Sequence, residues 1–300
     1  MKRKSKLKIK SLPRFVAFTL MSLPLILMIP LVMATLITKV TPALNGPKKA
    51  SEIATQVVEV SQVTATEDVK PTLEPEVSVS ATDPLETIKI RLRSGETKDI
   101  KVVFLTLDDG PSEHTGEVLD ILKKHDIKAT FFTTLHQGDT AKALYRRIVN
   151  EGHTLANHSS THNYDLYNNP EAFYADVKAL DEYQRQVTGL TETSHVFRFP
   201  GGSMNANETC ARGIVEMGFN YADWNVSSGD GSSTPPAKEI VAQNIIKGCR
   251  NFDISVVLCH AETKPDTRSA LSTVIETLKA EGYTFMAMEK DFTYPRQLEV

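Results

Sequence analysis

Residues 102–111 read VVFLTLDDGP, a short apolar run that ends in two adjacent carboxylates, a glycine and a proline. Such a run predicts a strand that stops at the first carboxylate. Similar runs recur at 129–134, 153–156, 195–199, 219–224, 254–259 and 283–288. Amphipathic stretches typical of helices lie between them, at 118–124, 141–150, 171–187, 237–247 and 269–281. The alternation indicates an α/β fold with parallel strands, and about seven β/α units in roughly 200 residues favour a barrel, closed or incomplete.

The folded domain is expected to span residues 85–300. Near its start, Ile88, Ile90 and Leu92 alternate with charged residues ahead of a turn at Ser94, which predicts a short strand with one apolar face. Upstream, residues 38–84 are rich in Thr, Val, Glu, Ser and Pro and contain no aromatic residue. A segment of that composition buries too little apolar surface to offset its chain entropy, so we expect a disordered extracellular stalk.

The first residues predict a membrane anchor. Residues 15–37 carry no charge and are long enough, as a helix, to cross a bilayer. The basic segment 1–14 before them is expected to stay in the cytoplasm, which places the remaining chain outside the cell. The alternative is a cleaved signal peptide and a secreted protein. The apolar run is longer than usual for such peptides and no clear A-x-A cleavage site follows, so a single-pass signal-anchor in the cell membrane is favoured.

Composition excludes some classes of function. The chain has 300 residues, of which 41% are apolar and 24% charged, as in a folded protein. Its net charge of −3, less the +7 of residues 1–14, leaves −10 for the other 286 residues. An acidic domain lacks the basic surface that nucleic acids require, so no nucleic-acid partner is expected. With three cysteines the chain is no disulfide scaffold, although a bond between Cys210 and Cys249 stays open in an extracellular domain.

Carboxylates and histidines follow two of the predicted strands, where a barrel carries its chemistry. Adjacent acids such as Asp108 and Asp109 repel each other, so a fold keeps them mainly where a cation or shared proton relieves the repulsion; a solvated turn is the alternative. His158 and His162, four residues apart, would lie on one face of a helical turn and could bind one metal ion. An Asp-His-His site with open positions is the arrangement of a catalytic metal.

Later strand ends add further candidates. Arg198 either forms a structural ion pair or orients a catalytic carboxylate, and Gly201 after it leaves a backbone N–H that could bind an oxyanion. Trp224, the only tryptophan, could be a core residue or a ligand contact. His260 closes an apolar strand, and strand alternation turns Cys259 away from its face.

Taken in order, these segments resemble the five motifs of the polysaccharide deacetylases, the NodB-homology domain or carbohydrate esterase family 4. The motif segments are TLDDGP at 106–111, HSSTH at 158–162, RFPGG at 198–202, WNVSSGD at 224–230 and LCH at 258–260. The resemblance covers about residues 100–290, and the chain is similar to peptidoglycan N-acetylglucosamine deacetylases. It implies a distorted (β/α) barrel that uses a divalent metal, commonly zinc, to remove acetyl groups from N-acetylated sugars.

Carried over by position, the resemblance gives each residue a role. It implies metal ligands at Asp109, His158 and His162. It implies a catalytic base at Asp108 oriented by Arg198, and a general acid at His260 positioned by Asp230. It implies an oxyanion contact from the N–H of Gly201 and acetyl-pocket walls at Trp224 and Leu258. The chain departs from the usual motifs at Phe199, Gly201, Ser227 and Gly231, and Glu262 lies near where an aspartate often follows the histidine.

The sequence thus predicts a membrane-anchored, metal-dependent hydrolase that acts on the amide bonds of acetylated amino sugars in a cell-wall glycan, most readily peptidoglycan. An O-acetyl esterase acting on xylan or a secondary wall polymer is one alternative, and a non-catalytic glycan-binding module is another. Zinc suits the Asp-His-His set, but Co²⁺, Ni²⁺ or Fe²⁺ could bind the same ligands. N-acetylglucosamine and N-acetylmuramic acid stay equally open as targets, as does the oligomeric state.

Overall fold

The structure is a computed structural model that describes residues 83–300. The predicted basic segment, membrane anchor and nearly all of the predicted stalk lie outside the described residues. The strands are β1 (Val102–Gly110), β2 (Thr130–Thr133), β3 (Thr154–Asn157), β4 (Val196–Phe197), β5 (Asn220–Tyr221), β6 (Val226–Ser227), β7 (Ile254–Cys259) and β8 (Thr284–Phe285). The α-helices are α1 (Pro84–Arg93), α2 (Thr115–Lys124), α3 (Asp139–Asn150), α4 (Pro170–Thr188), α5 (Glu208–Glu216), α6 (Lys238–Cys249) and α7 (Pro265–Ala280), with 3₁₀ turns η1 (Tyr164–Asn168) and η2 (Ser203–Asn205).

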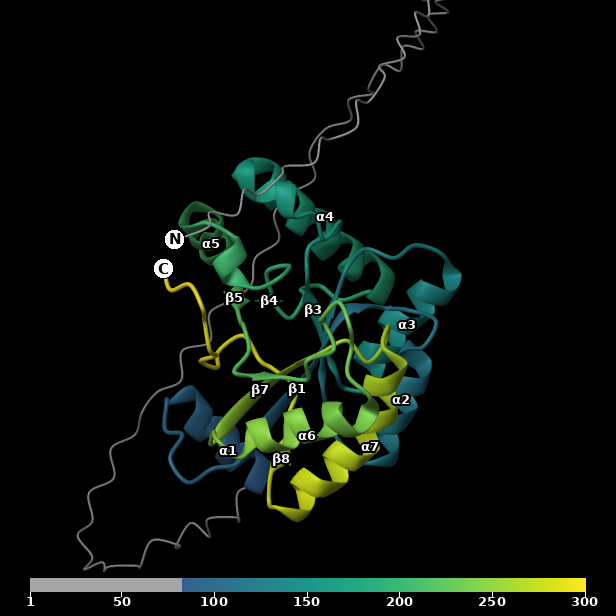
Figure 1. Cartoon of the computed structure of the whole chain (residues 1–300). Coiled ribbons are helices and arrows are strands. Elements are labelled where there is room, and N and C mark those ends of the chain that lie inside the picture. Colours follow the sequence, from purple (N-terminus) through teal and green to yellow (C-terminus); the bar gives the residue numbers. More distant parts are fainter. Residues whose placement is uncertain (1–82) are drawn as a thin grey trace, which may run out of the picture. The chain divides into compact units, whose positions relative to one another are not determined.

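The strands form one parallel sheet in the order β5-β4-β3-β2-β1-β7-β6, and β8 pairs with the first residues of β1. No hydrogen-bonded pair joins β5 to β6 within residues 83–300, so the sheet is an incomplete barrel. The α-helices other than α1 lie along the outside of the sheet, and α6 and α7 run side by side (Figure 1). The expectation of an α/β fold with parallel strands and helical crossovers is confirmed.

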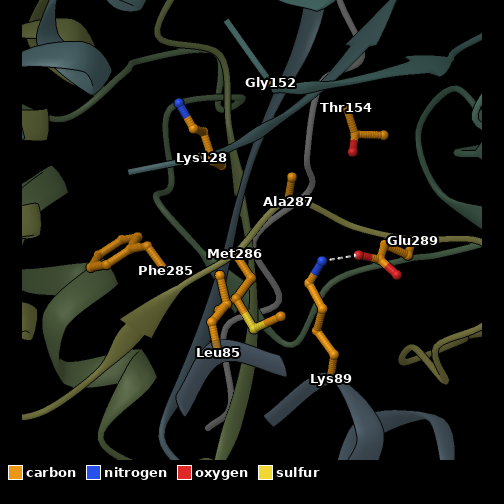
Figure 2. Close-up of a pocket in the computed structure, with 9 residues that line it drawn as sticks. All are labelled: Leu85, Lys89, Lys128, Gly152, Thr154, Phe285, Met286, Ala287 and Glu289. Atoms are coloured by element: carbon orange, nitrogen blue, oxygen red, sulfur yellow. Dashed lines mark ion pairs between the residues drawn. The ribbon is translucent and has the colours of Figure 1, made fainter. Parts of the chain in front are cut away.

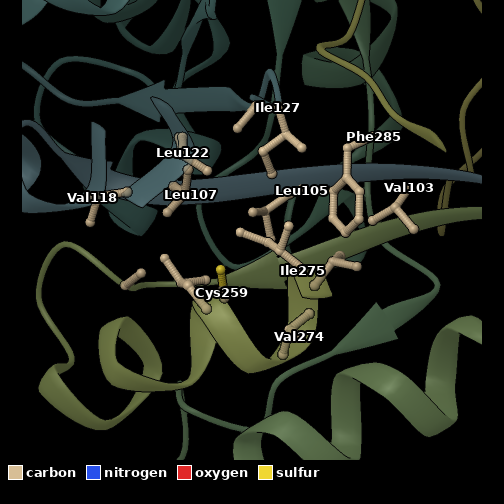
Figure 3. Packing of buried hydrophobic residues seen from close by; sticks show 14 of the residues in the cluster. Val103, Leu105, Leu107, Val118, Leu122, Ile127, Cys259, Val274, Ile275 and Phe285 are labelled. Atoms are coloured by element: carbon tan, nitrogen blue, oxygen red, sulfur yellow. The ribbon is translucent and has the colours of Figure 1, made fainter. Parts of the chain in front are cut away.

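Strand β1 lies at the centre because its side chains are buried on both faces. Val103, Leu105 and Leu107 pack outward against α2 and α7, in the cluster drawn in Figure 3. Val102 and Phe104 point to the other face and pack inside the barrel. Since successive side chains of a strand alternate between faces, an uninterrupted apolar run is what this position requires. The apolar run of β1 ends at the two carboxylates Asp108 and Asp109.

The predicted strand at residues 88–92 is wrong, because this segment is helix α1. The side chain of Asp83 accepts a hydrogen bond from the N–H of Leu85 at 3.0 Å, and Pro84 occupies the first turn, two features that favour a helix start. Ile88 and Leu92 share the inward face of the helix, whereas Ile90 is 54% exposed. Apolar residues two apart fit a strand and apolar residues four apart fit a helix, so this segment is compatible with both. The cap at Asp83 favours the helix.

Helix α1 lies against the end of the barrel where the strands begin. Lys89 forms a 2.7 Å ion pair with Glu289, beside a cavity of about 190 Å³ that Leu85, Phe285 and Met286 also line (Figure 2). Chemistry in parallel barrels lies at the opposite end, after the strands, so this cavity is not the candidate site.

Other differences from the predicted elements are small. Helix α5 and the two-residue strand β6 have no counterpart in the predicted elements, because both are short. The three cysteines are buried and free, with Cys210 in α5 and Cys249 at the end of α6 in separate apolar clusters, so the disulfide left open by the sequence does not form. Within residues 83–300, no helix combines the length and the apolar character that a membrane span needs.

Candidate metal centre and active site

A cavity of about 370 Å³ opens where β1, β3 and β7 end. It is lined by Asp108, Asp109, His158, His162, Tyr164, Gly201, Trp224, Gly231, Leu258, His260 and Lys264. Arg198 and Asp230 are almost fully buried and bond to two of these lining residues. The structure therefore brings every predicted site residue to one place, two of them as buried supports behind the cavity wall.

Three of the lining residues form a group that could hold a metal ion. The ligand atoms of Asp109, His158 and His162 lie within 4.8 Å of one another. Asp109 Oδ1 is 3.7 Å from His158 Nε2 and 3.4 Å from His162 Nε2, is buried, and has no hydrogen-bond partner among the described residues. A buried carboxylate oxygen without a partner is costly, and a divalent cation would satisfy it. The donor set therefore fits such an ion.

The protonation of His158 suits this role. Its Nδ1 lies 2.7 Å from the carbonyl oxygen of Arg198. Because a carbonyl only accepts, Nδ1 carries the hydrogen and Nε2 keeps its lone pair for a ligand bond. Burial lowers the pKa of His158 to about 3, which keeps the imidazole neutral at physiological pH.

The helical turn expected to align the two histidines is not present. Residues 158–163 form a loop in which Ser159 and His162 have left-handed backbones, with φ of +63° and +52°. Asp176 holds the loop, since its Oδ2 accepts the N–H groups of Ser160 and Thr161 at 2.9 and 3.2 Å. The two imidazoles still meet, with ring centroids 5.0 Å apart. Asp109 is also left-handed at φ +76°, so two of the three candidate ligands sit in strained conformations, as is common at functional sites.

Asp108 is fixed by a buried arginine. Arg198 Nη1 donates to Asp108 Oδ1 at 2.8 Å and to the hydroxyl of Thr106 at 2.6 Å, while Nε and Nη2 donate to backbone carbonyls of Ala222 and Asp223. The free oxygen, Oδ2, lies 3.7 Å from His158 Nε2 and so faces the candidate metal group. Burial raises the pKa of Asp108 and outweighs the opposing effect of Arg198. A carboxylate of raised pKa facing the cavity can accept a proton.

His260 is held by Asp230 from behind. Its Nδ1 lies 2.8 Å from Asp230 Oδ1, and its backbone N–H donates to Oδ2 of the same carboxylate at 2.7 Å. Thr267 also donates to that Oδ2. Burial by itself would lower the pKa of His260, but the Asp230 hydrogen bond and the nearby carboxylates outweigh it and raise the pKa overall. His260 Nε2 is 3.8 Å from Asp109 Oδ2, so the Nε2 edge of the ring faces the metal group.

Glu262 has a structural role that sequence reasoning missed. It is fully buried, one carboxyl oxygen bonds the hydroxyl of Thr115, and the other has no partner among the described residues. The carboxyl fills the space beside Gly110, where an added Cβ would lie 2.1 Å from it, while its backbone carbonyl accepts from Ser112. Burial raises the pKa of Glu262 to about 8. The carboxyl thus packs against the end of β1 that carries Asp109; the only sequence signal was its nearness to His260.

The remaining predicted residues form the rim of the cavity. Trp224 and Leu258 are partly buried, and Trp224 also packs on the cluster inside the barrel, so the core and ligand-contact interpretations both describe it. Gly201 is exposed with φ +70°, and its N–H has no protein acceptor among residues 83–300. Cys259 is buried in the outer cluster, as predicted.

Comparison with known proteins places this arrangement in a family. The family model described as polysaccharide deacetylase matches residues 95–222. A peptidoglycan-N-acetylglucosamine deacetylase from Bacillus cereus is 34% identical over 205 residues, which cover 66% of this chain and 73% of the relative. A peptidoglycan-N-acetylmuramic acid deacetylase from Bacillus subtilis is 27% identical over 208 residues, covering 69% of this chain and 76% of the relative.

Solved structures agree with the sequence matches. The catalytic domain of a peptidoglycan N-acetylglucosamine deacetylase from Eubacterium rectale superposes with a TM-score of 0.61 at 33% identity, over 67% of this chain and 96% of that one. A polysaccharide deacetylase from Bacillus cereus gives 0.59 at 33% identity, over 65% and 96% of the two chains. The expected resemblance is confirmed: the chain belongs to the polysaccharide deacetylase family of hydrolases.

Proposed function

We propose that this protein removes N-acetyl groups from amino sugars of peptidoglycan in a metal-dependent hydrolysis. The observation that carries the proposal is the convergence of three groups on one cavity: the Asp109-His158-His162 cluster, the arginine-held carboxylate of Asp108 and the aspartate-held imidazole of His260. Together they offer a cation site, a proton acceptor and a proton donor. That is the set required to hydrolyse an amide with water.

The metal is proposed to be zinc, held by Asp109, His158 and His162. A carboxylate with two imidazoles is a donor set that zinc accepts, with positions left for water and substrate. Cobalt, nickel or iron could occupy the same ligands. When bound, a divalent ion polarises the acetyl carbonyl and lowers the pKa of water.

The protein groups then divide the proton transfers. Asp108, fixed through one oxygen by Arg198, accepts the proton of the attacking water with the other. The N–H of Gly201 donates to the acetyl oxygen as negative charge develops there, a contribution of the kind worth about 10²–10³ in rate. His260, kept protonated by Asp230, donates to the nitrogen as the amine leaves. Trp224 and Leu258 enclose the methyl group of the acetyl.

The choice of peptidoglycan rests on the relatives, several of which are named as peptidoglycan deacetylases. Both N-acetylglucosamine and N-acetylmuramic acid occur among the named targets of these relatives. Which of the two sugars this protein attacks is therefore a question for experiment. We also propose that residues 15–37 anchor the chain in the cell membrane and that residues 38–84 let the domain reach the wall. Sequencing of the mature N-terminus tests the anchor, because a terminus beyond residue 35 would contradict it.

Mass spectrometry of peptidoglycan fragments tests the reaction. The full chain is incubated with the fragments in the presence of zinc, beside a chelated sample and a sample given O-acetylated xylan. Loss of acetyl mass from the fragments in the zinc sample alone is expected, and the mass of each fragment identifies the sugar. Acetyl loss confined to xylan would replace the proposal with an O-acetyl esterase. No loss from either substrate would favour a non-catalytic glycan-binding module.

A further inference from the structure

Tyr164 is an exposed aromatic side chain at the candidate active site. It begins η1, two residues after His162, and is 49% exposed. Among the large apolar side chains that are exposed in residues 83–300, it alone lines the cavity of about 370 Å³. Ligand pockets are commonly lined by aromatic side chains together with a few converging polar groups. Tyr164 lies outside the five motif segments and takes no part in the proposed proton transfers.

Its ring is held in place by neighbours on more than one side. The ring meets His162 edge to face, with centroids 5.4 Å apart, and Tyr167 in the same manner at 6.3 Å. These contacts orient the ring before any ligand binds, so little conformational entropy is left to lose on binding. The phenol hydroxyl has no hydrogen-bond partner among the described residues and is free to bind a ligand hydroxyl.

The glycine at position 201 makes room for this ring. A Cβ added there would lie 2.7 Å from Tyr164 Cε1, closer than real Cβ atoms approach, and 3.0 Å from its hydroxyl oxygen, which is also tight. The ring therefore occupies the space that a side chain at 201 would take. It lies next to the Gly201 N–H that is proposed to contact the acetyl oxygen, on the same rim as His162.

We infer that Tyr164 is a sugar-binding residue that packs against the pyranose ring carrying the acetyl group; this inference rests on the proposed function. Pyranoses with equatorial hydroxyls present a flat face of C–H groups, which are electropositive. The face of an aromatic ring is electronegative and apolar, so the two surfaces complement each other. The acetyl group would then reach the metal group while the sugar lies on Tyr164.

Substitution with two substrates tests this assignment. Tyr164→Ala, Tyr164→Phe and the unsubstituted full chain are loaded with zinc and assayed on an N-acetylglucosamine oligomer and on an aryl acetate that carries no sugar. Phe252→Ala is the matched control, because Phe252 is an exposed aromatic residue, 41% accessible, that does not line the cavity. Bound zinc is measured for each chain, and oligomer binding is measured separately in an Asp108→Asn background.

Tyr164→Ala is expected to raise KM for the oligomer, and to weaken its binding, by about fivefold or more. Hydrolysis of the aryl acetate and zinc content should not change, and Tyr164→Phe should keep most of the affinity. Equal losses on both substrates, or loss of zinc, would show that the ring only supports His162 and would overturn the inference. An unchanged KM and affinity would overturn it too. An unsubstituted chain that neither cleaves nor binds the oligomer or peptidoglycan fragments would refute the proposed function, and this inference with it.

Discussion

Replacing Asp108 by asparagine tests whether this residue acts as the proton acceptor without being a metal ligand. The side chain is 3% exposed, and its Oδ1 accepts from Arg198 Nη1 at 2.8 Å. Removing one partner of a buried ion pair costs about 3–5 kcal/mol. Asparagine keeps an acceptor oxygen for Arg198, so we expect the loss of unfolding free energy to be nearer the cost of a weakened hydrogen bond, about 1–3 kcal/mol.

The effect on activity should be far larger than the effect on folding. An amide cannot accept the proton of the attacking water, and a general base typically contributes about 10²–10⁴ in rate. Zinc binding should persist, because Asp109, His158 and His162 are untouched. Acetate release from peptidoglycan fragments, bound zinc and thermal unfolding are measured on the same preparation. Asp120→Asn is the matched control, since it makes the same change in an Asp–Arg pair on the protein surface.

The reasoning would be refuted by an Asp108→Asn chain that is loaded with zinc and releases acetate within about tenfold of the unsubstituted rate. Such a result would assign the proton transfer to another group. Loss of zinc along with activity would show instead that Asp108 belongs to the metal site.

Three further substitutions have distinct outcomes. His158→Ala removes a candidate ligand, so zinc and activity should disappear together; tightly bound zinc in this variant would contradict the metal site. Asp230→Asn keeps an acceptor oxygen for His260 but removes the negative charge that helps to raise its pKa, so the fall in activity on the alkaline side should move to lower pH; an unmoved pH profile would argue against the acid role. Burial raises the pKa of Glu262 from 4.5 to about 8, so the folded state keeps a proton that the unfolded state has released. The metal-free protein should therefore lose stability as pH rises from about 4.5 to about 8, and Glu262→Gln should lose less over that range; equal slopes would show that Glu262 is ionised.

The location of the site could be predicted from the sequence because parallel strands bring their carboxyl ends together. Asp108, His158 and His260 each follow a run of apolar residues, so recognising the strands was enough to predict that these side chains converge. Arg198 was expected either to pair structurally or to orient a carboxylate, and its hydrogen bond to Asp108 fits both descriptions.

Features that depend on contacts between distant segments were not predictable in this way. The loop at 158–163 is held by Asp176 and by left-handed residues, which a spacing of four residues between histidines cannot reveal. Glu262 packs against Gly110, the last residue of β1, from far along the chain. The apolar spacing of helix α1 fits a strand as well as a helix, and only the cap at Asp83 distinguishes the two.

Stepwise addition of zinc to the metal-free chain tests the central claim most directly. Acetate released from peptidoglycan fragments is followed together with bound zinc, in the unsubstituted chain and in His158→Ala. The account predicts that acetate release is absent without metal, rises in proportion to bound zinc, levels off at about one ion per chain, and does not appear in His158→Ala. Undiminished acetate release from the metal-free chain, or full restoration of His158→Ala by zinc, would contradict it.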